Sequence, residues 1–124
     1  MSRIMSLFSK SFSMLILMFY IFNFNFIYIM IKYLVEFLGT FFFLSVIMIA
    51  SSSNIKWAFL PIGLALSMVI YWGGNISGGH YNPAVSLMFY ANKQISYLDT
   101  FAYIISQIIG GLFALFFYRM NFTK

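Results

Sequence analysis

Residues 76–86 read Ile-Ser-Gly-Gly-His-Tyr-Asn-Pro-Ala-Val-Ser, a polar and glycine-rich stretch inside an otherwise apolar chain. In lipid, irregular backbone persists only where protein buries it or where it lines a water-filled path, because unsatisfied backbone groups are costly there. A stretch of this kind between apolar segments therefore indicates a passage through a membrane.

The composition supports an integral membrane protein. Of the 124 residues, 63% are hydrophobic and 7% are charged, whereas a soluble domain carries roughly a quarter charged residues. The basic residues stand singly along the chain, so no basic patch forms and no nucleic-acid partner is expected. Because the chain has no cysteine, disulfides and thiolate metal sites are excluded.

Four apolar stretches approach the length of about 20 residues that a membrane-spanning helix needs; they are residues 12–31, 33–50, 57–72 and 101–118. Polar breaks are predicted at residues 51–56, 73–82 and 92–96. Small residues on the last helix, at positions 106, 110 and 114, and on the third, at positions 63 and 67, predict close helix packing.

The pair Asn82-Pro83 predicts the start of a short helix over residues 83–91. Asparagine is a preferred N-cap, and proline is well placed at the first helical position. Nine residues rise only about 13–14 Å, roughly half the thickness of the hydrocarbon core. The N-terminus of such a half-helix would place a partial positive charge inside the membrane, which attracts electron pairs and repels cations, protons included.

Three segments in this order resemble the aquaporin and glycerol-facilitator family. Residues 76–86 resemble its first Asn-Pro-Ala loop, in the form that bacterial water channels have. Residues 35–40, Val-Glu-Phe-Leu-Gly-Thr, resemble its first-helix motif, and residues 103–111, Tyr-Ile-Ile-Ser-Gln-Ile-Ile-Gly-Gly, resemble its third-helix motif. The resemblance implies an all-α membrane protein: a half-repeat of three transmembrane helices plus one re-entrant half-helix over residues 32–124, preceded by an extra apolar helix.

The resemblance also implies residues that line a pore. Asn82 would donate its amide hydrogens to the solute, and the carbonyl groups of Gly78, Gly79 and His80 would line the half-pore. Pro83 opens the half-helix, and Ala84 is small enough for an opposing half-helix to meet it. Ile62 matches a position that shapes the narrow filter and is aromatic in strict water channels, so isoleucine there predicts a more apolar and wider constriction.

Three polar side chains are expected to support the loop rather than to contact solute. Glu36 is an ionisable residue within a predicted span, which by itself fits a proton relay, an ion site or a buried hydrogen-bond acceptor. The resemblance implies the acceptor, which would hold the loop backbone, with Gln107 as an interior amide and the His80 ring as a brace. A lone histidine is a poor metal site, and no metal or other cofactor is expected.

The family pairs two inverted repeats around one pore, and the 124 residues hold one Asn-Pro-Ala motif. We therefore expect a channel subunit for water or small neutral solutes in a lipid bilayer. It would be completed by a second half-repeat, from a homo-oligomer or from another half-channel chain. The alternatives are a non-conducting membrane protein that associates with full-length channels, and an inactive truncated fragment. No enzyme activity is expected.

The first 31 residues have no counterpart in the family. They fit an extra apolar helix, an interfacial extension of the first helix of the half-repeat, or non-native translated sequence. No function is assigned to them.

Overall fold

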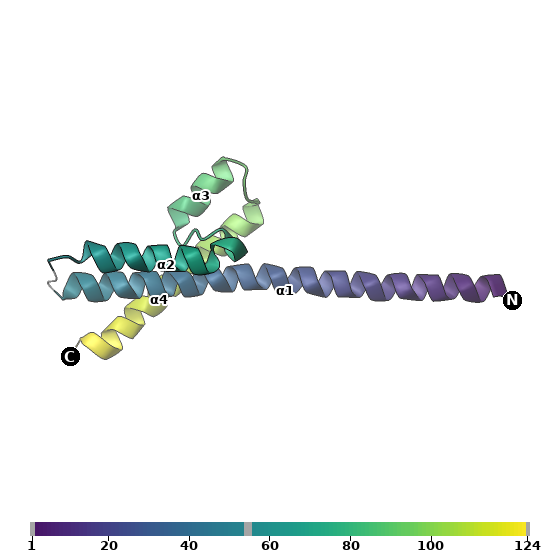
Figure 1. Ribbon diagram of the computed structural model, residues 1–124, viewed down its shortest axis with the longest axis horizontal. Coiled ribbons are helices and arrows are strands. Elements are labelled where there is room, and N and C mark those ends of the chain that lie inside the picture. Colours follow the sequence, from purple (N-terminus) through teal and green to yellow (C-terminus); the bar gives the residue numbers. More distant parts are fainter. Residues whose placement is uncertain (1, 54–55, 124) are drawn as a thin grey trace. The chain divides into compact units, whose positions relative to one another are not determined.

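The computed structural model describes the backbone of residues 2–53 and 56–123, and side chains from residue 10 onward. Within these ranges the secondary structure is helical, with α1 (Ser2–Ser52), α2 (Phe59–Ser77), α3 (Pro83–Ala91) and α4 (Tyr97–Phe122) (Figure 1). Three of these helices contain segments long and apolar enough to cross a membrane: residues 10–52, 59–77 and 97–122. The predicted all-α membrane fold is confirmed.

The chain divides into two compact units, residues 1–30 and residues 31–124, and each is described by itself. In the first unit the side chains from Lys10 to Met30 are exposed, apart from Asn23, which is partly exposed. The Asn23 Nδ2 donates a hydrogen bond of 2.8 Å to the Phe19 carbonyl, one turn earlier. These residues thus form an apolar helix without a buried core of its own.

The expected boundary between two helices near residue 32 is absent, because α1 continues through it. Lysine is a good helix former, and neither glycine nor proline interrupts residues 31–38. The three interpretations offered for residues 1–31 stay predictions.

In the second unit, α2 runs along residues 31–52 of α1, and α4 crosses the same part of α1 (Figure 1). A small apolar core of Val35, Val69 and Tyr81 lies where α1, α2 and the loop meet. Glycine allows α4 to approach α1 closely, since a Cβ atom built on Gly110 would lie 2.6 Å from the Phe37 carbonyl oxygen. The helix packing predicted for residues 110 and 114 is therefore present, and both residues are buried.

The small residues of α2 behave differently. Gly63 and Ser67 are exposed, and a Cβ atom built on Gly63 would meet nothing within 4 Å. The close packing predicted for this face is therefore not formed among the residues that the structure describes.

The break expected from residue 73 begins later, because α2 runs through Gly73 and Gly74 to Ser77. Gly78 ends the helix in the left-handed conformation, with φ +90°, and its N–H donates 2.9 Å to the Gly74 carbonyl. This is a common C-terminal cap. The helix ends where a residue tolerates positive φ, and not at the first glycine.

α3 has the predicted bounds, and its N-cap is Asn82 in extended conformation. A turn with Lys93 at φ +58° follows, and Ser96 then caps α4 by accepting a hydrogen bond of 3.0 Å from the Asp99 N–H. This cap starts α4 four residues earlier than the apolar pattern predicted.

Candidate functional site

The Glu36 side chain lies beneath the loop that joins α2 to α3 and has no exposed surface. It accepts four hydrogen bonds. Its Oε1 accepts from the Ser77 hydroxyl at 2.7 Å and the His80 backbone N–H at 2.9 Å. Its Oε2 accepts from the Tyr81 backbone N–H at 2.7 Å and the Gln107 amide at 2.9 Å. Each carboxylate oxygen thus satisfies two donors, which is what a buried charged group needs.

A second set of hydrogen bonds connects the loop to the half-helix. The Gln107 Nε2 also donates to the Ser86 hydroxyl at 2.9 Å, and the His80 Nδ1 lies 3.0 Å from the same hydroxyl oxygen. The Ser86 hydroxyl therefore links the Gln107 amide to the His80 ring. The ring of Tyr103 packs edge-on against the His80 ring, with centroids 5.2 Å apart.

Tyr103 also holds the end of α2. Its hydroxyl donates a hydrogen bond of 2.6 Å to the Ser77 carbonyl, one of the carbonyls that the end of a helix leaves without an intrahelical partner. The Ser77 hydroxyl in turn accepts from the Gly79 N–H at 3.1 Å. The loop is therefore held from α1 by Glu36 and from α4 by Gln107 and Tyr103.

The Asn82 side chain caps α3 while remaining exposed. Its Oδ1 accepts a hydrogen bond of 2.9 Å from the Ala84 N–H, which leaves the two amide hydrogens directed away from the cap. Pro83 occupies the first turn, and Ala84 is exposed beside it. Gly78 and Gly79 both have positive φ, +90° and +66°, which glycine adopts without steric cost.

The predicted pore-lining residues do not all lie together. Gly78, Gly79, His80 and Asn82 form one continuous loop, in which the His80 side chain is buried and the Asn82 side chain is exposed. Ile62 instead lies in the first turns of α2, where its N–H donates to the Ala58 carbonyl, and it is partly exposed. Its role, like that of the loop residues, stays a prediction.

Sequence reasoning missed several residues of the site. Ser77, Ser86 and Tyr103 carry much of the hydrogen bonding, and each is at least nine-tenths buried. Ser86 stands one helical turn after Asn82, on a half-helix with few polar residues, and that position could have revealed it. Tyr81 could not be identified from the sequence, because tyrosine seldom adopts positive φ and this conformation is therefore not expected at its position.

The fold and this site together define an integral membrane protein with a re-entrant half-helix that buried polar side chains hold in place. The sequence profile of the Major intrinsic protein family matches residues 23–123, so residues 23–31, which were expected to have no counterpart in the family, fall within the match. The chain belongs to this family of membrane channels, as the resemblance predicted.

Curated relatives agree with this assignment. The chain is 42% identical over 86 residues to a "Glycerol uptake facilitator protein-like 6" of Lactiplantibacillus plantarum, covering 67% of this chain and 40% of the relative. It is 37% identical over 92 residues to an "Aquaporin Z" of Photorhabdus laumondii, with coverage of 67% and 40%. It is 35% identical over 86 residues to a "Lens fiber major intrinsic protein" of Rattus norvegicus, with coverage of 62% and 32%. The matched part thus spans 40% or less of each of these relatives.

Proposed function

We propose that residues 32–124 form one half of a channel for water or small neutral solutes, with the loop from Gly78 to Asn82 as its selective segment. The observation that supports this most is the Asn82-capped half-helix, held from beneath by the buried Glu36 carboxylate. A half-helix ending inside a bilayer is tolerated only where protein or a water-filled path satisfies its backbone groups.

In this proposal Asn82 contacts the solute. Its Oδ1 is engaged with the Ala84 N–H at 2.9 Å, and its two amide hydrogens would donate to the oxygen of water or of a hydroxyl group. The carbonyl groups of Gly78, Gly79 and His80 would accept hydrogen bonds along the same path. Alternating donors and acceptors of this kind replace the hydrogen bonds that the solute has in bulk water.

Charged solutes would be excluded by the half-helix itself. The first turn of α3 contains no acidic residue, so its own side chains do not neutralise the partial positive charge at its N-terminus. Cations and protons therefore meet a repulsive field next to Asn82. No covalent step and no enzyme activity belong to this proposal.

A second half-repeat would complete the pore. Asn82 and Ala84 are exposed, and an uncovered asparagine amide facing lipid would be costly. The Asn82 amide consequently requires a polar partner, which we propose to be the loop of a second half-repeat, from another copy or another chain. Ile62 would line the path farther along α2.

The test is osmotic shrinkage of proteoliposomes that contain this chain, measured by stopped flow beside empty vesicles. We expect shrinkage faster than in empty vesicles, with the low activation energy of a pore. Asn82→Asp should abolish it, because the new carboxylate removes the donor and would hold cations. Insertion is checked by protease protection in every sample.

Shrinkage at the rate of empty vesicles, with insertion verified, would rule out a channel formed by copies of this chain alone. Reconstitution together with a full-length family channel then distinguishes the remaining possibilities. Co-purification with that channel without added permeability would favour a non-conducting associated subunit.

A further inference from the structure

We propose that Tyr81 is a positioning residue, which sets the place of the Asn82 amide by seating its ring in a socket made by two glycines on different helices. This inference rests on the proposed function, because it concerns the same loop. Tyr81 directly precedes Asn82, and its side chain is 2% exposed. The position of its backbone therefore fixes where the next residue begins.

The socket consists of Gly39 on α1 and Gly73 on α2. A Cβ atom built on Gly39 would overlap the ring carbons of Tyr81, and one built on Gly73 would overlap its hydroxyl oxygen. Both glycines are buried. The Tyr81 ring thus occupies the space that a side chain at either position would take.

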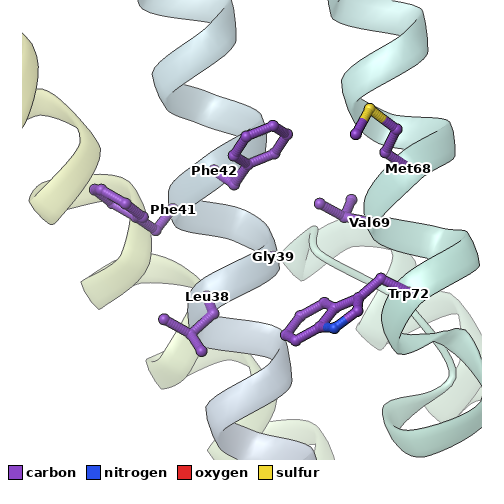
Figure 2. A pocket seen from close by; sticks show the side chains of 7 residues that line it. All are labelled: Leu38, Gly39, Phe41, Phe42, Met68, Val69 and Trp72. Atoms are coloured by element: carbon purple, nitrogen blue, oxygen red, sulfur yellow. The ribbon is translucent and has the colours of Figure 1, made fainter.

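Figure 2 shows Gly39 between the side chains of Leu38 and Phe42, with its backbone facing Val69 of α2. These residues border an apolar groove of about 450 Å³ between the two helices. The Val69 carbonyl accepts a hydrogen bond of 2.7 Å from the Tyr81 hydroxyl. The ring is consequently held at its edge by Gly39 and at its tip by α2.

The Tyr81 backbone is also constrained. Its φ is +48°, a left-handed conformation that a residue with a bulky side chain seldom adopts. Its N–H donates to the Glu36 Oε2 at 2.7 Å. Ring, hydroxyl and N–H together maintain this conformation, and the chain then enters Asn82 with extended backbone, φ −155°.

The experiment measures the position of the loop directly, without relying on conduction. The chain has no cysteine, so Ala84→Cys supplies a single thiol next to Asn82, and Asn92→Cys supplies one at the other end of α3. Both variants are reconstituted as the full chain, and the labelling rate with a water-soluble thiol reagent is measured. The readout is the ratio of the rate at position 84 to the rate at position 92.

Gly39→Ala should change this ratio by about tenfold or more, because a free-energy difference of about 1.4 kcal/mol corresponds to a factor of ten and overpacking commonly reaches that size. Tyr81→Phe keeps the ring and loses only the hydroxyl, so it should shift the ratio in the same direction by a smaller factor. Gly63→Ala is the matched control, since its Cβ meets nothing within 4 Å, and it should leave the ratio unchanged.

A double-mutant comparison separates positioning from a loss of folding. In a Tyr81→Leu background the ring is absent, so adding Gly39→Ala should have little further effect on the ratio. If Gly39→Ala and Gly63→Ala alter the ratio equally, or if the effect of Gly39→Ala persists in the Tyr81→Leu background, the socket does not position the loop. A chain that shows the expected ratios but no permeability would overturn the proposed function and leave the socket standing.

Discussion

Residues 10–30 and residues 31–52 belong to the same helix, α1, and both stretches are predominantly apolar, yet they differ in almost every structural respect. The side chains of the first stretch are exposed except for Asn23, which is partly exposed. The second stretch buries Val35, Glu36 and Thr40 among its side chains, together with Gly39.

The difference shows which residues carry structural information in a membrane protein. Apolar side chains satisfy lipid equally well on any face of a helix, so they predict insertion but not packing. Small residues permit close approach of helices, and buried polar residues require specific partners. In α1 the residues with polar partners on another element begin with Lys32 and Tyr33, which contact Asp99, and the site forms from Glu36 onward.

The largest expected effect comes from Glu36→Gln. This variant tests whether buried hydrogen bonds, rather than buried apolar area, stabilise the packing of residues 31–52. One acceptor oxygen becomes an NH₂ group facing donors, so at least one pair of buried hydrogen bonds is lost. Each donor left unpaired costs about 1–3 kcal/mol. We expect a lower midpoint of unfolding in detergent, followed by circular dichroism, and a loss of osmotic permeability.

Thr40→Val is the control for that change, on the same helix one turn later. The Thr40 Oγ1 is buried and has no hydrogen-bond partner among the residues described, so its removal should leave the unfolding midpoint unchanged or raise it. Equal destabilisation by both variants would mean that any change to a buried polar side chain on this face has the same effect, whether or not that side chain has hydrogen-bond partners.

Gly110→Ala comes next and tests the contribution of close helix approach. The added methyl group would lie 2.6 Å from the Phe37 carbonyl oxygen, and overpacking of this kind costs about 1–3 kcal/mol. The free energy of unfolding should fall, measured by titration with a denaturing detergent. Gly63→Ala, where the space is open, should show no such loss, and a similar decrease in both would contradict the packing difference between α2 and α4.

Tyr103→Phe should have a smaller effect. It removes the hydrogen bond of 2.6 Å from the Tyr103 hydroxyl to the Ser77 carbonyl while keeping the ring against His80. The expected cost is about 0.5–1.5 kcal/mol, measured as a shift of the same detergent titration. No change at all would show that the carbonyl finds another donor.

The smallest effect is expected from Asn23→Leu in the first stretch. The amide bonds only to the Phe19 carbonyl of its own helix among the described contacts, and an exposed substitution of this type usually changes stability by less than about 0.5 kcal/mol. The unfolding midpoint of this variant should match that of the parent chain. A large shift would indicate that residues 10–30 are packed against a partner in the membrane.

Much of the fold follows from local patterns in the sequence. Asn82-Pro83 predicted the first residue of α3 because capping depends on the residues themselves. The family resemblance implied that Glu36 holds the loop backbone, and in the structure its oxygens accept from the His80 and Tyr81 N–H groups. The roles of these residues in a channel remain predictions.

Other features could not be read from the sequence because they depend on distant residues. Tyr81 has φ +48°, and its ring lies against Gly39 of α1 and Gly73 of α2, both far from it in the sequence. The exposure of Gly63 could not be distinguished from the burial of Gly110, since both glycines lie in similar small-residue patterns. The predicted end of α2 was too early because the run of glycines from Gly73 was taken as the break. The helix in fact ends at Ser77, before Gly78 in the left-handed conformation.

The four donors around Glu36 also determine how protons behave near the loop. Three of them are amide N–H groups, from His80, Tyr81 and Gln107. An amide can hold a hydrogen bond but does not readily release its proton and take up another, as a water molecule or an imidazole does. The link from Glu36 to the His80 ring passes through the Gln107 amide and then the Ser86 hydroxyl. Among the described residues only the Ser77 hydroxyl meets the carboxylate with a readily exchangeable proton, at 2.7 Å, so three of the four contacts hold the loop without offering a step for proton transfer.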